Sequence, residues 1–97
     1  MSNYVKSLYE LYDIIIKLKH LENVKLDKEL FFIWFDALGY HFSLRKMEGG
    51  KNRLYYQKKG ENHALEYDYY DQDLLLKDLK EIDKRAKGFE ERSLFDD

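Results

Sequence analysis

Residues 66–73, EYDYYDQD, form the densest group of side chains in the sequence that could do chemistry. They comprise four acids and three tyrosines among eight positions. Such a stretch fits a cation site, a face that imitates the phosphates of nucleic acid, or an ordinary strand that leads into a helix. A calcium loop is disfavoured, because Asp68, Asp71 and Asp73 lack both the glycine and the later bidentate glutamate that such loops use. We predict no bound metal ion and no cofactor.

If residues 64–70 form a strand, alternate side chains point to opposite faces. Tyr67 and Tyr69 then point inward, and the acids point outward. The acids can be purely structural, because they lie across from Arg53 and its neighbours, and opposite charges on paired strands contribute about 0.2–1 kcal/mol each. The same outward row can instead dock on a basic groove of a partner. The predicted partner-binding residues are Glu66, Asp68, Tyr70, Asp71 and Asp73.

Basic residues dominate the segment that precedes this acidic stretch. Residues 41–60 carry six basic side chains against one acid, whereas residues 61–83 carry eight acids against two lysines. Clustered lysine and arginine bind phosphates, and proteins that bind single strands add aromatic rings on which bases stack. The acidic pI of about 5.9 weakens this interpretation. Nucleic-acid binding is accordingly the alternative function, that of an accessory protein that uses the basic hairpin 45–59. The binding residues of this alternative are Arg45, Lys51, Arg53, Tyr55, Lys58 and Lys59.

Residues that could carry catalysis are scattered. His20, His41 and His63 fall in separate predicted elements, and the chain has no cysteine. No serine lies in a glycine elbow, and no glycine-rich loop precedes a predicted helix. Asp78 and Lys80 match the acid-x-Lys spacing of some nucleases, but two residues apart on a helix their side chains point away from each other. We predict that the protein is not an enzyme.

Three helices are predicted from hydrophobic periodicity. Apolar residues at spacings of three and four predict a helix over residues 4–21. Asp27 is a suitable cap for a second helix over residues 28–39, KELFFIWFDALG, which Gly39 would end. A third helix begins at Asp71 or Asp73 and runs to about residue 87, where Gly88 would end it. Its apolar stripe comprises Leu75, Leu79, Ile82, Ala86 and Phe89.

Between the second and third helices the period changes to two, which is typical of half-buried strands. Three strands follow from residue 40 to residue 70, with a hairpin loop at residues 49–51. Matching their apolar faces pairs Leu44 with Tyr56 and Leu54 with Tyr69. The predicted fold is α+β: two N-terminal helices, a three-stranded antiparallel meander and a C-terminal helix (ααβββα), with the helices packed on one sheet face.

Aromatic residues are unusually dense in the predicted second helix. They cannot all share one stripe, so the helix is either buried nearly all round or has one side open to solvent. An open aromatic side would form a homodimer interface. The residues of this alternative dimer surface are Phe31, Phe32 and Phe35.

Length and composition indicate one compact domain over residues 1–97, in which residues 90–97 form a tail without periodicity. Apolar residues make up 44% of the chain and aromatic residues 16%, which excludes a disordered chain although 37% of residues are charged. The absence of cysteine suits a reducing cytoplasm. Asp13 interrupts the most apolar part of the N-terminal segment, so we expect neither a signal peptide nor a membrane association.

These observations predict a small, non-enzymatic, intracellular interaction protein, monomeric or homodimeric. It would bind a macromolecular partner, itself a nucleic-acid-binding protein for example, through the acidic and aromatic sheet face, and would inhibit or adapt that partner by occlusion. Composition and size are similar to those of small proteins of phages and mobile elements, among them inhibitors of host defence nucleases. The likeness is one of composition and covers no motif.

Overall fold

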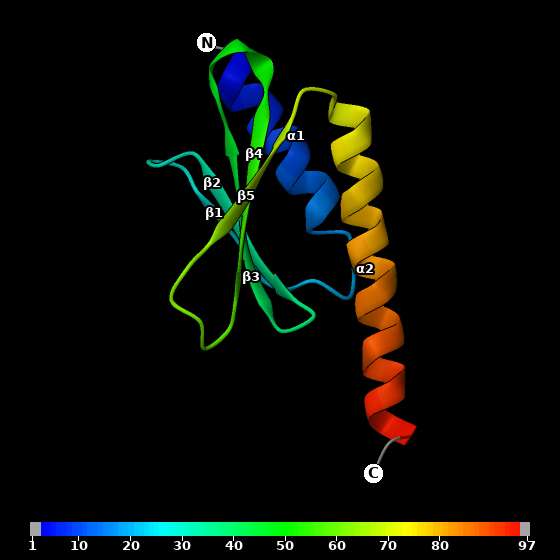
Figure 1. The fold of residues 1–97 in the computed structure, drawn as a ribbon. Helices are drawn as coiled ribbons and strands as arrows, with labels where there is room; N and C mark the ends of the chain where they lie inside the picture. Colours follow the sequence, from blue (N-terminus) through cyan, green and yellow to red (C-terminus); the bar gives the residue numbers. More distant parts are fainter. Residues whose placement is uncertain (1–2, 96–97) are drawn as a thin grey trace.

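The computed structural model describes the backbone of residues 3–95 and the side chains of residues 8–89. It is an α+β fold with a five-stranded antiparallel sheet and two helices (Figure 1). The elements are α1 (Asn3–Ile15), β1 (Glu22–Asp27), β2 (Phe32–Ala37), β3 (Tyr40–Lys46), the 3₁₀ turn η1 (Glu48–Gly50), β4 (Asn52–Lys58), β5 (Leu65–Tyr69) and α2 (Gln72–Phe95).

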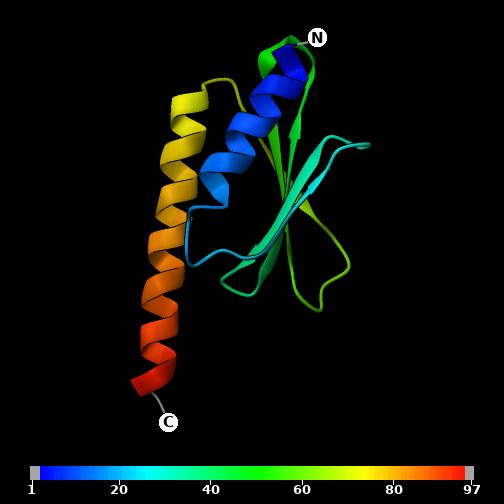
Figure 2. The same ribbon diagram turned by 180° about the vertical axis from the view of Figure 1, so that it is seen from behind.

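The sheet is a meander, because its strand order β1-β2-β3-β4-β5 follows the order of the strands in the chain. All four pairs are antiparallel. Both helices lie on the same face of the sheet (Figures 1 and 2), and α2 contacts β2 and β5 directly. Within residues 3–95, no helix lies on the other face.

The predicted ααβββα fold is wrong, because the sheet has five strands instead of three and the predicted second helix is absent. Residues 28–39 contain β2 and its flanking turns, and β2 pairs with β1. Residues 32–37 alternate, with Ile33 and Phe35 buried and Trp34 exposed. Asp27 accepts hydrogen bonds from the amides of Glu29 and Leu30 at 3.0 and 2.9 Å, as a cap does. The segment that it caps is a turn and not the predicted helix. The positive φ of 57° at Phe31 then stops any helix.

Gly39 ends β2 and not a helix. Leu38 and Gly39 have φ values of 56° and 78°, and they join the paired residues Ala37 and Tyr40. Two consecutive residues with positive φ are what the tight type I′ turn requires, and this turn matches the twist of antiparallel strands. The chain therefore reverses sharply and β2 pairs with β3 along its whole length.

The strand predicted from residue 40 is confirmed, but its partner register was wrong by two residues. Leu44 pairs with Leu54, not with Tyr56, and Leu54 pairs with Tyr67, not with Tyr69. The cause is the position of the two turns, each of which is centred one residue earlier than predicted, and such a displacement shifts the register by two. The connection after β3 contains η1 and closes around Gly49 instead of Gly50, with a 2.8 Å hydrogen bond from the Met47 amide to the Lys51 carbonyl. A shift of two residues keeps every side chain on its predicted face.

The core fills the space between the helices and the sheet. α1 contributes Leu8, Leu11 and Ile15, and the sheet contributes residues such as Ile33, Phe35 and Leu44. From α2 the predicted stripe supplies three buried residues, namely Leu75, Leu79 and Ala86. α1 ends at Ile15, earlier than predicted, and α2 continues through Gly88 to Phe95, where an end and a tail were predicted.

In the part of the chain that the structure describes, neither helix is both long and apolar enough to cross a membrane.

Candidate functional site

The helix-free face of the sheet is the main candidate for a functional surface, because its side chains are not needed to fill the core. Strand pairing aligns these side chains in rows that cross all five strands. One row is Lys25, Trp34, Ser43, Tyr55 and Glu66; the next is Asp27, Phe32, Arg45, Arg53 and Asp68.

Three aromatic residues form a ridge at the centre of this face. Phe32 stacks on Trp34 with ring centroids 6.2 Å apart, and Phe32 lies 6.4 Å from Tyr55. The guanidinium of Arg45 lies over the Phe32 ring at 5.3 Å, a distance that permits a cation–π interaction. Trp34 remains 37% exposed. We refer to Phe32, Trp34 and Tyr55 as the aromatic ridge.

A polar network borders the aromatic ridge around Asp36. The Asp36 carboxylate accepts a 2.8 Å hydrogen bond from the Asn23 amide group, contacts the His41 ring and lies 3.7 Å from the ammonium of Lys59. Desolvation raises its pKa, but these hydrogen bonds and the charges of His41 and Lys59 outweigh that effect and lower the pKa overall. Trp34 and this network line a hollow of about 480 Å³.

The acidic side chains of β5 lie on the helix-free face, as their predicted parity requires, and Asp68 is largely neutralised. Arg53 donates to Asp68 at 2.7 and 3.1 Å, and Lys51 donates to it at 3.1 Å. Hydrogen bonds from Arg53 above all lower the pKa of Asp68 to about 2. Glu66 has a looser contact with Arg53, at 3.9 Å, and its side chain is 56% exposed.

The remaining predicted partner-binding residues lie beyond the end of β5. Tyr70 is 80% exposed, with the ammonium of Lys51 at 5.8 Å from its ring centroid. Asp71 caps α2, because its carboxylate accepts a 2.9 Å hydrogen bond from the amide of Asp73. The structure thus places Glu66 and Asp68 in rows with the aromatic ridge, while Asp71 and Asp73 belong to the start of α2.

The inward residues of β5 differ from the prediction in one respect. Tyr69 is buried, and its hydroxyl donates a 2.7 Å hydrogen bond to Asp78. Burial, together with this bond, raises the pKa of Tyr69. Tyr67 was predicted to be equally buried, but it is 54% exposed. It shares the helix side of the sheet with Tyr69, at a part of β5 that the helices leave uncovered.

The basic hairpin divides between different surroundings and does not form one patch. Arg45, Arg53 and Tyr55 lie on the helix-free face. Lys58 pairs with Tyr40 and lies on the helix side of the sheet. Arg53 and Lys51 are bound to Asp68, and Lys59 reaches Asp36.

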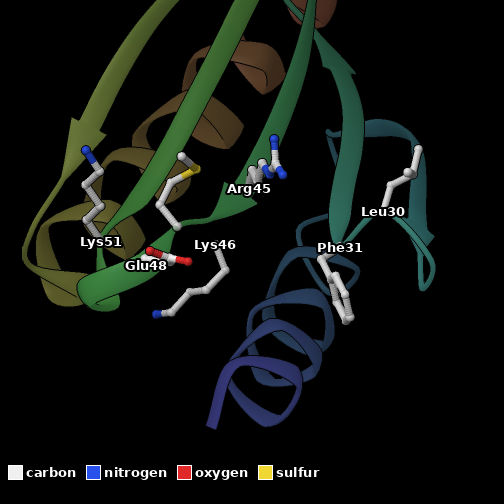
Figure 3. A pocket seen from close by; sticks show the side chains of 7 residues that line it. Leu30, Phe31, Arg45, Lys46, Glu48 and Lys51 are labelled. Atoms are coloured by element: carbon white, nitrogen blue, oxygen red, sulfur yellow. The ribbon is translucent and has the colours of Figure 1, made fainter. Parts of the chain in front are cut away.

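A hollow of about 510 Å³ lies between the tips of the β1–β2 and β3–β4 hairpins. Arg45, Lys46 and Lys51 line it, but their charged ends point apart, as Figure 3 shows. Partial burial lowers the pKa of Lys46. Because the cations do not converge, the hollow does not form an anion site.

The helix that was to carry the predicted dimer surface is absent, and the three residues of that surface lie in different surroundings. Phe35 is buried in the core, Phe32 lies on the helix-free face and Phe31 lies in the turn before β2. The location of Phe32 and Trp34 on one face of a strand was not predicted from the sequence. The signal was their alternation with Ile33 and Phe35, followed by a Leu-Gly pair that can form a tight turn.

The candidates for catalysis stay apart in space. His41 is bound to Asp36, His63 lies in the loop before β5, and the amide of His20 donates to Asp83 at 2.9 Å. Asp78 accepts the hydrogen bond from Tyr69. Within the described residues, no three histidine, aspartate or glutamate side chains are grouped closely enough to hold a metal ion.

No protein-family model, curated protein or solved structure matches this chain.

Proposed function

We propose that the protein is a non-enzymatic interaction module that binds another protein through the helix-free face of its sheet. The observation that carries this proposal is the aromatic ridge of Phe32, Trp34 and Tyr55, which lies on the face opposite the core. Binding energy at protein interfaces is concentrated in central tryptophan, tyrosine and arginine residues. The ridge offers such a centre, with Arg45 against it.

Charged and polar residues surround the aromatic ridge. They include Lys25 on one side, Glu66 on the other and the Asp36 network at one end. An apolar centre with a hydrated polar rim is the usual anatomy of a transient protein interface. The exposed rim charges would steer association and set the orientation of the partner.

The pairing of charges favours a protein over a nucleic acid as the partner. Arg53 and Lys51 are engaged by Asp68, and Lys59 lies near Asp36. A phosphate backbone would have to displace these carboxylates or sit beside them, and each like charge would reduce the electrostatic gain that drives such binding. A protein surface with both signs of charge meets no such penalty.

The proposed mechanism is occlusion. A partner seated on the ridge loses access to its own covered surface, and this module inhibits or adapts it without chemistry. The acidic residues Glu66 and Asp68 retain a part in this proposal as one side of the rim, rather than as the centre of an imitation of nucleic acid.

The test uses the single tryptophan of the chain as a reporter at the centre of the proposed interface. Wild-type protein and the Trp34→Ala variant serve as parallel baits in a lysate of the source organism, and each captured protein is then purified and titrated. We expect Trp34→Ala to weaken the binding of the true partner by about 2 kcal/mol or more, a rise in Kd of roughly 30-fold. The partner should also shift the Trp34 emission of the wild type.

Tyr9→Ala is the matched control, because Tyr9 is an exposed aromatic residue of α1, which lies on the helix side of the sheet. Circular dichroism verifies that both variants are folded. If Trp34→Ala leaves the affinity of the captured protein unchanged, and its binding leaves the Trp34 emission of the wild type unchanged, the ridge is not the interface. Quenching of Trp34 by an oligothymidylate at moderate salt, with a steep salt dependence, would support the nucleic-acid alternative instead.

A further inference from the structure

The two edges of the sheet, β1 and β5, differ in regularity. Pairing of β1 with β2 is interrupted between Glu22 and Lys25, and Asn23 has a φ of 53°. Irregularities of this kind protect an edge strand, because they disturb the row of backbone groups that another strand would need. β1 is therefore a poor template for a further strand.

β5 has no such irregularity. Its five residues pair one to one with Tyr56 through Asn52 of β4, without a shift in register. Because β4 is its only neighbour in the sheet, alternate residues of β5 direct their N–H and C=O groups away from the sheet. A regular edge of this type can accept one more strand.

Apolar side chains are exposed along this same edge. On the helix side of β5, Tyr69 is buried, whereas Tyr67 is 54% and Leu65 is 53% exposed. Figures 1 and 2 explain the difference: β5 approaches α2 only at its C-terminal end, and its beginning runs toward the 59–64 loop, away from the helix. Leu65 and Tyr67 therefore form an uncovered apolar strip beside an open edge.

We propose that the β5 edge binds an extended segment of another protein, which adds a sixth strand whose side chains alternate between apolar and cationic. Apolar residues of the segment would cover Leu65 and Tyr67 on the helix side. Its cationic residues would lie on the helix-free side, and one of them would lie next to Glu66. Backbone hydrogen bonds supply affinity in this mode of recognition, and the alternate side chains supply specificity.

Charge complementarity identifies the occupant. Glu66 is the most exposed acid of the strand and has only a 3.9 Å contact with Arg53, so a lysine or arginine beside it gains a new partner. A second copy of this chain is disfavoured. Every antiparallel register that matches the faces of two β5 strands and pairs at least three of their residues sets Glu66 or Asp68 opposite an acid of the other copy. Like charges directly opposite each other are destabilising.

This inference goes beyond the proposed function, because the open backbone groups of β5 and the strip of Leu65 and Tyr67 lie outside the aromatic ridge, and only Glu66 and Asp68 border both. A partner can use the ridge alone, the edge alone or both. Trp34→Ala leaves the edge intact, and changes on β5 that point to the helix side leave the ridge intact.

The probe is a synthetic peptide of alternating lysine and valine. A scrambled peptide of the same composition and an alternating glutamate and valine peptide serve as comparisons. Titration into isotopically labelled protein is followed by amide chemical shifts and by hydrogen exchange. We expect shifts and slowed exchange at residues 65–69, and about tenfold weaker binding of the glutamate peptide, because several cross-strand charge pairs change sign.

Two variants complete the test. Leu65→Lys removes part of the apolar strip and should abolish binding of the lysine–valine peptide, whereas Leu30→Lys, the same change at an exposed leucine of the turn between β1 and β2, should leave it unchanged. No shift at about 1 mM peptide, which corresponds to binding weaker than about 4 kcal/mol, would overturn the proposal, as would equal binding of the scrambled peptide. Light scattering provides the last check, since a dimer that Leu65→Lys disperses would assign the edge to a second copy.

Discussion

The packing of α2 on the sheet can be tested with two leucines of that helix, Leu79 and Leu74. Leu79 is fully buried within the core, whereas Leu74 is 44% exposed. Replacing each by alanine removes the same atoms from the same helix. The difference between the two variants therefore measures burial alone, free of any difference in helix propensity.

The expected magnitudes follow from these exposures. Truncation of a fully buried leucine loses about 2–5 kcal/mol, which includes the cavity that the surrounding core cannot fill. At Leu74 only part of the side chain is removed from an apolar environment and solvent occupies the space, so a loss of about 1 kcal/mol is expected. For a chain of this size, each 1 kcal/mol lowers the melting temperature by about 4–8 °C. The difference of about 1–4 kcal/mol between the variants means that Leu79→Ala should melt roughly 4–30 °C below Leu74→Ala.

The assay is thermal and urea denaturation, followed in parallel by far-ultraviolet circular dichroism and by the emission of Trp34. Circular dichroism reports chiefly on the helices, and Trp34 reports on the sheet, so coincident transitions indicate that both unfold together. Equal melting temperatures for the two variants would refute the placement of α2 on the sheet through Leu79. A loss of helix signal with an unchanged tryptophan transition would show instead that α2 is not part of the cooperative unit.

Two further predictions concern the turn after β2 and the ion pairs of β5. Gly39→Ala should destabilise the protein by about 1–2 kcal/mol, because a Cβ meets no atom there and only the positive φ of 78° opposes it. Gly88→Ala, inside α2 and equally free of contacts, should stabilise it by about 0.5–1 kcal/mol, and equal shifts in melting temperature would contradict the assigned backbone conformations. The pKa of Asp68 is lowered to about 2, so its stabilising effect is complete above the unfolded value of about 4 and is lost as the pH falls toward 2. Melting temperatures of wild type and Asp68→Asn should therefore converge across that pH range, and a constant difference would show that the pair does not depend on the charge of Asp68.

The parts of the fold that the sequence predicted are those with one unambiguous period. Tyr40, Phe42 and Leu44 alternate over a full strand, and Leu75 and Leu79 recur at helical spacing. Residues 30–38 are different, because their apolar side chains satisfy a period of two and a period of 3.6 at once. Pairing with β3 decides between the two, and that interaction is tertiary.

The same limitation applies to the functional surface. The alternation of side chains along a strand correctly predicted that Glu66 and Asp68 point outward, because this argument requires only that β5 is a strand. The aromatic ridge depends on three strands at once, and the assignment of Phe32 and Trp34 to a helix concealed it. Exposure of Tyr67 could not be predicted either, because it depends on the angle at which α2 leaves β5.

The sequential order of the strands has a consequence for how the chain reaches its folded state. Each strand pairs with the one made just before it, so the sheet can grow hairpin by hairpin, with short loops to close at each step. α2 is the last of these elements to be synthesised, and its buried residues Leu75 and Leu79 complete the core. During synthesis a nearly finished sheet would expose the part of its apolar side that α1 does not cover until α2 leaves the ribosome, and association with other chains in this interval would compete with folding. The rate at which α2 docks would then set the yield of folded protein.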